Sequence, residues 1–150
     1  MFLGSFEHSL DAKGRVSLPA RFREVLSSNG EGRLVLTTNV DPGAKCLVAY
    51  PNAQWQAFQE RLAELPQFEP DVIQLKRLLI GGASEVTLDR QGRLLIPPVQ
   101  REYAGLNGSV LFAGLGPTIE LWDRALWEEQ RSKAQESLPR INDSMSRLGL

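Results

Sequence analysis

The sequence predicts an α+β protein in which two tandem, pseudo-twofold related repeats build one small β-rich barrel with flanking helices. Three observations support this fold class. The chain contains an internal repeat, each copy begins with the polar and apolar alternation of short strands, and helix-like apolar spacing follows in each copy. A chain of 150 residues with 42% hydrophobic residues can bury one compact core.

The internal repeat has an offset of 78 residues. It aligns EHSLDAKGRVSLPARFREVL (7–26) with EVTLDRQGRLLIPPVQREYA (85–104), and 8 of these 20 positions are identical. The correspondence resumes at an offset of 72, where Trp55 aligns with Trp127. The identities fall mainly on turn and cap residues, so both copies should share one local structure.

Each copy should begin with two short strands that form a hairpin. In the first copy Leu10, Val16 and Leu18 alternate with polar residues, which is the period of a half-buried strand. An Asp-x-x-Gly turn joins the two strands, because Asp suits the first position of a type I turn and Gly tolerates the positive φ that follows. Proline then ends the second strand and suits the first turn of a short helix, for which Asn29-Gly30 and Gly105 are the predicted stops.

The later elements follow the same reasoning. A second strand pair is expected at 33–38 with 46–50 in the first copy, and at 109–113 with 118–122 in the second. Amphipathic helices are expected after Asn52 and after an Asp123 N-cap, with a linking helix at 71–80. The polar sequence from Pro139 predicts a frayed or disordered tail. The expected organisation is therefore 1–66 for the first repeat with its helix, 67–82 for the linker, 83–138 for the second repeat and 139–150 for a flexible tail.

The composition argues against several function classes. The chain has one histidine and one cysteine, so neither an internal disulfide nor a Cys/His zinc site is expected. Without a Ser/His/Asp set or a phosphate-binding glycine loop, we expect no enzyme, no metal and no cofactor. No secretory signal or membrane-length apolar run is visible, which favours a cytoplasmic protein without a membrane partner.

Four further residues have structural or functional interpretations. His8 aligns with Val86 in the apolar series and is expected to be packed or partly buried, and Cys46 is expected in the core. For Trp55 and Trp127 two interpretations stay open, internal packing or anchoring of an oligomer.

A local basic cluster is the candidate functional feature, because a net charge of −1 gives no global attraction to nucleic acid. Arg15 and Arg93 follow the turn glycines on the polar face, where a guanidinium can bind phosphate or the O6/N7 edge of guanine. Asp11 and Asp89 should bind backbone N–H groups and orient these arginines. The candidate DNA-binding residues are Lys13, Arg15, Arg21, Arg23, Arg90, Arg93 and Arg101, and the turn residues are Asp11, Gly14, Asp89 and Gly92.

These motifs resemble those of a known family. The opening M-F-x-G, the run L-D-x-K-G-R-x-S-L-P-A-R-F-R-E and the later L-D-x-x-G-R-L-L-I-P-P are similar to the MraZ family, a duplicated relative of AbrB-like swapped-hairpin proteins with a double-psi type of barrel. The resemblance implies a nucleoid-associated transcriptional repressor of the division and cell-wall gene cluster, including its own gene. It also implies ring-shaped homo-oligomers on direct repeats in promoter DNA, and DNA contacts from Asp11 to Arg15 and from Asp89 to Arg93. The two turns differ, with Ala12-Lys13 in one and Arg90-Gln91 in the other, so equal contributions are not implied.

A protein-interaction or antitoxin-like scaffold is the alternative, since AbrB-like barrels also serve as dimerisation units. An antitoxin normally adds a partner-wrapping tail to a single barrel copy, whereas this chain devotes its length to a second copy.

Overall fold

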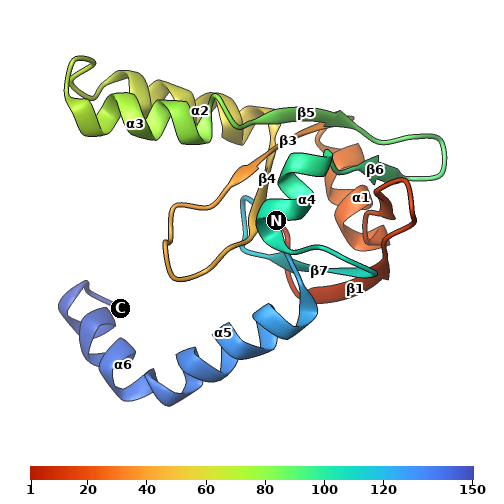
Figure 1. Cartoon of the computed structure of the whole chain (residues 1–150). Helices are drawn as coiled ribbons and strands as arrows, with labels where there is room; N and C mark the ends of the chain where they lie inside the picture. Colours follow the sequence, from red (N-terminus) through yellow and green to blue (C-terminus); the bar gives the residue numbers. More distant parts are fainter.

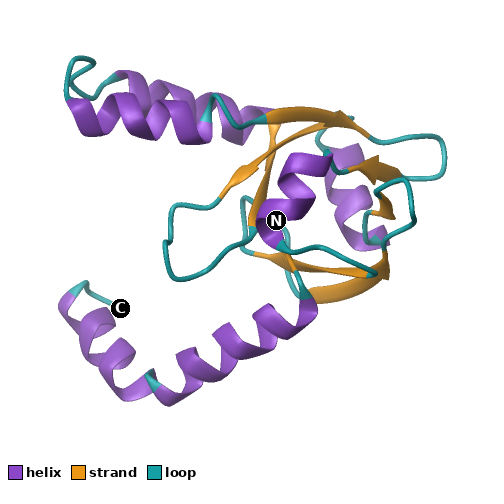
Figure 2. Cartoon of the chain, in the orientation of Figure 1, coloured by secondary structure: helices purple, strands orange, loops and turns teal.

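The computed structural model describes residues 1–150 and has the mixed α+β composition predicted from the sequence (Figures 1 and 2). The strands are β1 (Ser5–Ser9), β2 (Arg15–Ser17), β3 (Arg33–Thr38), β4 (Leu47–Pro51), β5 (Ser84–Thr87), β6 (Arg93–Leu95), β7 (Ser109–Gly114) and β8 (Ile119–Trp122). The helices are α1 (Ala20–Ser28), α2 (Asn52–Ala63), α3 (Pro70–Leu79), α4 (Pro98–Ala104), α5 (Arg124–Glu136) and α6 (Leu138–Arg147).

The strand pairing treats the two copies alike. Six strands form one antiparallel sheet in the order β1-β7-β8-β4-β3-β5, and β2 pairs with β6 in a separate two-stranded ribbon. The counterparts in this sheet are β1 and β5, β3 and β7, and β4 and β8. When each strand is exchanged for its counterpart, the order is the same, read from the other edge of the sheet. Three contacts cross between copies at the start of each repeat, β1 with β7, β5 with β3, and β2 with β6. Neither copy is therefore a self-contained unit of hydrogen bonding.

This pairing corrects the predicted hairpins. The strands on either side of the first turn do not pair with each other beyond one bridge, Leu10 with Val16, and the bond from the Asp11 amide to the Arg15 carbonyl. The reason is burial. A three-residue strand has only one inward side chain, and Val16 lies directly opposite Leu94 of the other copy, where both are 1% exposed.

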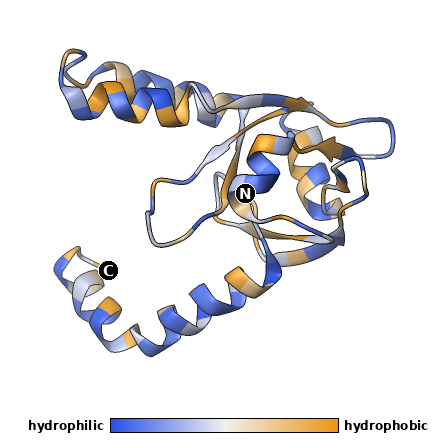
Figure 3. Cartoon of the chain, viewed as in Figure 1, coloured by the Kyte–Doolittle hydropathy of each residue, from blue (hydrophilic) through white to orange (hydrophobic).

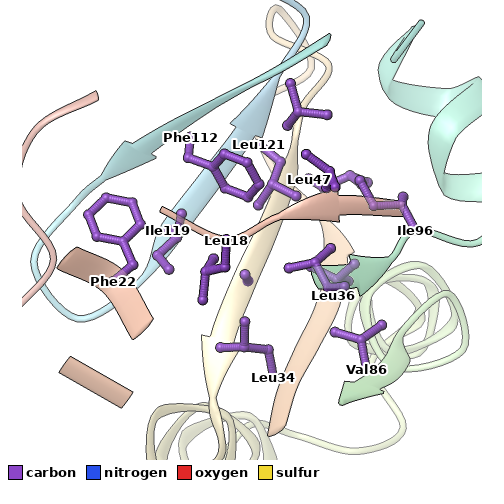
Figure 4. Close-up of a cluster of buried hydrophobic side chains, with 14 of the residues drawn as sticks. Leu18, Phe22, Leu34, Leu36, Leu47, Val86, Ile96, Phe112, Ile119 and Leu121 are labelled. Carbon is purple, nitrogen blue, oxygen red and sulfur yellow. The ribbon is translucent and has the colours of Figure 1, made fainter. Parts of the chain in front are cut away.

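One core unites both copies. Figure 4 shows Leu18, Leu34 and Leu36 of the first copy gathered with Ile96 and Phe112 of the second, among other buried side chains. At the N-terminal edge the Phe22 ring makes edge-to-face contacts with Phe2 and Phe6, each with ring centroids 5.4 Å apart. Each fully buried side chain of this size contributes about 1.5–3 kcal/mol. The ribbon that carries the turns therefore rests on a rigid base.

The helix ends mostly follow the predicted signals. Asp123 caps α5 by accepting a hydrogen bond from the Leu126 amide at 3.1 Å, and α1 ends at Asn29. Helix α4 ends at Gly105, whose φ of 64° is the left-handed conformation that favours glycine. The linking helix and the second strand pair of each copy also form within one or two residues of their predicted bounds.

The C-terminal prediction is wrong in one respect. Residues 138–147 form α6 instead of irregular tail, although none of its side chains is buried. Pro139 occupies the first turn, where its missing N–H has no intrahelical partner, and Leu138, Ile141 and Met145 recur at helical spacing. In Figure 1, α5 and α6 extend from the body as one arm, and the α2–α3 pair extends as another. Hydrophilic colours dominate most of α5 in Figure 3.

The remaining single-residue predictions concern packing. His8 is half-buried with its ring 6.2 Å from that of Phe112, and Cys46 is fully buried, as expected. Burial raises the pKa of the Cys46 thiol well above its usual range. Trp55 packs on Tyr50 with ring centroids 5.3 Å apart, and Trp127 packs on Trp122 with ring centroids 5.9 Å apart. Both tryptophans therefore have internal packing partners. Their role as oligomer anchors stays a prediction.

Candidate nucleic-acid interface

The first turn, Asp11 to Arg15, is organised by one carboxylate. Asp11 Oδ1 accepts hydrogen bonds from the Lys13 amide at 2.9 Å and the Arg15 amide at 2.8 Å. Asp11 Oδ2 accepts from Nε of the Arg15 side chain at 2.8 Å. The aspartate therefore fixes both the backbone of the turn and the direction of its arginine, as the sequence predicts.

The second turn repeats this geometry. Asp89 Oδ1 accepts from the Gln91 and Arg93 amides, both at 2.9 Å, and Asp89 Oδ2 accepts from Arg93 Nε at 2.9 Å. The only side chains that differ lie at the two central positions of the turn, which make no side-chain hydrogen bond in either copy. The duplicated sequence therefore folds into a duplicated side-chain arrangement.

The electrostatics of both turns favour a charged carboxylate. The hydrogen bond from the Arg15 amide is the main cause that lowers the pKa of Asp11, and the Arg93 amide does the same for Asp89. Each carboxylate engages only the Nε edge of its arginine. The two Nη groups, which form the outer edge of the guanidinium, make no hydrogen bond to protein and can meet a ligand.

The β2–β6 ribbon puts both arginines on one face. Arg15 pairs with Leu95 and Ser17 pairs with Arg93, so these four side chains share a face, while Val16 and Leu94 occupy the other. Diagonal neighbours in an antiparallel pair lie about 7–8 Å apart. The side chains of Arg15 and Arg93 remain 35% and 29% exposed. Figure 1 places both turns at the end of the molecule away from the two helical arms.

Each turn is also bonded to the opposite copy. The Gly92 carbonyl accepts from the Leu18 amide at 3.0 Å, and the Gly14 carbonyl accepts from the Ile96 amide at 2.9 Å. Both glycines have positive φ, 85° at Gly14 and 74° at Gly92. Each turn is therefore held by hydrogen bonds to the opposite copy as well as by the bonds within it. The separation of the two turns is set by the ribbon.

The other predicted cations occupy two kinds of position. The side chains of Lys13, Arg90 and Arg21 are exposed and make no hydrogen bond to protein. Arg23 and Arg101 are half-buried, and the side chain of each donates to a backbone carbonyl. Arg23 Nη1 donates to the Leu18 carbonyl at 2.8 Å, and Arg101 Nε donates to the Ile96 carbonyl at 2.9 Å.

Two residues of this face were not singled out from the sequence. Ser17 and Leu95 lie between the two arginines, and Leu95 is 53% exposed. The signal was present, because strict alternation from Arg15 leads to Ser17 and from Arg93 leads to Leu95. An exposed leucine beside an arginine suits contact with an apolar group such as a thymine methyl.

No cluster of three or more His, Cys, Asp or Glu side chains has the geometry to hold a metal ion. None of the helices combines the length and the apolar character needed to cross a membrane.

Comparison with known families accounts for the duplication. The model of a family described as "MraZ protein, putative antitoxin-like" matches twice, over residues 1–78 and 79–147. The chain belongs to the MraZ family. This confirms the resemblance noted in the sequence motifs.

Curated MraZ relatives cover almost the whole chain. A protein of Coxiella burnetii named Transcriptional regulator MraZ is 45% identical over 144 residues, which is 95% of this chain and 93% of that protein. A relative of the same name from Halorhodospira halophila is 46% identical over 88% of this chain and 86% of its own length. Another, from Syntrophomonas wolfei, is 38% identical over the full length of both.

Proposed function

We propose that this MraZ family member is a sequence-specific DNA-binding transcriptional repressor, and that the β2–β6 ribbon is its reading surface. The observation that carries the proposal is the pair of aspartate-oriented arginines, Arg15 and Arg93, on one exposed face. The names of the relatives, which are transcriptional regulators, support the same function. The strand exchange between copies supports the finer fold assignment, an AbrB-like swapped-hairpin barrel of the double-psi type.

The recognition chemistry follows from the free edges of the guanidiniums. A two-stranded ribbon fits the major groove, and an arginine whose Nε is held by Asp presents both Nη groups to the O6 and N7 atoms of guanine. Each good contact of this kind contributes about 1–3 kcal/mol of discrimination between bases. In this proposal Lys13 and Arg90 at the turn tips, together with Arg21, Arg23 and Arg101, contact phosphates.

Tight binding requires several chains. With a net charge of −1 the molecule has no global attraction for DNA, and two arginines form a small reading surface. We therefore propose a homo-oligomer, in the form of a ring, that binds direct repeats in the promoter of the division and cell-wall gene cluster, including its own gene. Linkage of several weak sites raises the overall affinity by about 10²- to 10⁴-fold. A protein with this role acts at the nucleoid in the cytoplasm.

The test combines DNA selection with salt titration. DNA that co-purifies with the protein is expected to contain tandem copies of one short element, and binding to that element is then measured by fluorescence anisotropy. The Arg15→Ala/Arg93→Ala variant should lose about 1–3 kcal/mol per arginine and most of the preference over a scrambled site. The Lys13→Ala/Arg90→Ala variant should weaken both sites alike and reduce the salt slope by about one unit per cation.

Arg140→Ala is the matched control, since Arg140 is an exposed arginine on α6 whose side chain makes no hydrogen bond to protein. It should bind like the unaltered chain. Undiminished binding by the Arg15→Ala/Arg93→Ala variant would refute the assigned reading surface.

An antitoxin-like or protein-interaction scaffold is the second candidate, because the family description includes the word antitoxin. That function predicts a protein complex that forms in nuclease-treated extract and persists in the Arg15→Ala/Arg93→Ala variant. Loss of DNA binding together with loss of any such complex favours the repressor.

A further inference from the structure

Two arginines of the helices that follow the ribbon reach across to the turn of the opposite copy. A methyl group built on Gly92 would lie 2.6 Å from Cδ of Arg23, and one built on Gly14 would lie 2.7 Å from Cζ of Arg101. Both turns therefore use glycine partly because an arginine of the other copy covers the place of a side chain.

Leu18 and Ile96 complete each contact. The Leu18 amide donates to the Gly92 carbonyl, while the Leu18 carbonyl accepts from Nη1 of Arg23. The Ile96 amide donates to the Gly14 carbonyl, while the Ile96 carbonyl accepts from Nε of Arg101. In each case the amide of one residue bonds the opposite turn, and the carbonyl of the same residue bonds the covering arginine. Both of these residues, Leu18 and Ile96, are fully buried.

We propose that Arg23 and Arg101 are positioning residues that act across the repeat, Arg23 on the turn that carries Arg93 and Arg101 on the turn that carries Arg15. The proposal rests on the function proposed above and adds a coupling within it. Each reading arginine is held in place by the copy that does not contain it, so the two turns are set as a pair. The remaining N–H groups of Arg23 and Arg101 are free to bind phosphate. The main role of the two arginines, however, is to keep the opposite turn ordered.

The first test needs no DNA. Hydrogen–deuterium exchange of the intact protein compares the peptide containing Gly92 and Arg93 with the peptide containing Gly14 and Arg15. Arg23→Lys keeps the charge and the aliphatic stem but loses the planar fork, and it should speed exchange of the Gly92 peptide severalfold while leaving the Gly14 peptide unchanged. Arg101→Lys should do the opposite.

Arg21→Ala is the matched control, because Arg21 lies on the same helix as Arg23, is exposed, and its side chain makes no hydrogen bond to protein. It should change neither peptide. Equal acceleration of both peptides by Arg23→Lys, or acceleration only in its own copy, would overturn the proposal, because its claim is selectivity for the opposite turn.

The second test uses affinity for the selected DNA element. If Arg23 acts through Arg93, the combined loss in Arg23→Lys/Arg93→Ala should be at least about twofold smaller than the product of the single losses. The combination with Arg15→Ala should be multiplicative, and the reverse pattern should hold for Arg101. Arg23 losses that multiply with both reading arginines, together with unchanged exchange, would mark a simple phosphate contact and refute positioning. If the unaltered protein binds no DNA, the proposed function fails while the exchange experiment still decides the positioning role.

Discussion

At the residue scale, the two turn aspartates determine where the positive charge of each turn points. Asp11 receives three N–H bonds within five residues of chain, and Asp89 receives the same set. An arginine held only by its Nε edge loses little further freedom when its outer edge binds a base. In the proposed function, the aspartates therefore orient the arginines for DNA without contacting it themselves.

These hydrogen bonds make the turns resistant to acid. The pKa of each aspartate is lowered below the ordinary aspartate value of 3.8, mainly by the hydrogen bond from the arginine amide. Because the folded-state pKa is the lower one, the stabilisation is complete above the unfolded pKa and is lost only as the pH falls through the folded value. Carboxyl ¹³C shifts of Asp11 and Asp89 should stay constant from pH 8 to about 5 and titrate with midpoints below 3.8. A midpoint at or above 3.8 would contradict the bonding described here.

Glycine substitutions should reveal the contact between copies. Gly14 and Gly105 both have positive φ, 85° and 64°, so alanine at either position carries the left-handed cost of about 1–2 kcal/mol. Gly14→Ala should cost more, because the added methyl meets Arg101, whereas nothing lies within 4 Å of the corresponding point at Gly105. Urea unfolding of the two variants measures the difference. Equal losses would mean that the arginine moves aside freely.

The sequence predicted the local chemistry of these residues better than their long-range contacts. Asp, Gly and Arg at fixed spacing define a turn whose hydrogen bonds are all within five residues. The contact of Arg23 with Gly92 joins positions 69 apart in the sequence. Local spacing does not distinguish such an arginine from a free surface cation. The sequence therefore predicted DNA contact for both types alike.

At the scale of elements, helix ends were predictable because their signals are local. The Asp123 cap is one case that can be tested. Asp123→Ala removes the acceptor of the Leu126 amide and should cost about 0.5–2 kcal/mol, with a loss of helical circular dichroism from α5. Asp71→Ala is the control, since α3 has no side-chain N-cap bond. Similar losses in the two variants would show that the cap contributes nothing specific.

Strand partners were less predictable than strand positions. Alternation of apolar and polar residues indicates which face of a strand is buried, but the same pattern fits a partner in the same copy or in the other. A single inward side chain, such as Val16 on β2, can be buried by an apolar neighbour from either copy. In this fold the neighbour that buries Val16 is Leu94. The prediction for the C-terminal segment was wrong for a different reason. The polar sequence from Pro139 predicted a frayed or disordered tail, whereas Pro139 occupies the first turn of a helix.

At the scale of the whole molecule, the duplication produces one folding unit that places Arg15 and Arg93 on one face of the β2–β6 ribbon. The first copy contributes β1 and β2, whose strand partners, β7 and β6, both belong to the second copy. The distance between Arg15 and Arg93 is therefore independent of the linker between the copies, because it is set by the shared β2–β6 ribbon.

The interlocked pairing predicts that the first repeat cannot fold as a monomer. A chain of residues 1–78 would keep the β3–β4 pair but lose every partner of β1 and β2, and it would expose the side of the core that Ile96, Phe112 and Leu121 cover. Because the pairing pattern is the same for both copies, a second chain of 1–78 can supply equivalent strands. Circular dichroism and sedimentation equilibrium over a range of concentrations should therefore find an unfolded chain when dilute and a structured dimer when concentrated. A cooperative, folded monomer at all concentrations would contradict this view, because it would require each copy to complete its own sheet and close its own hairpin.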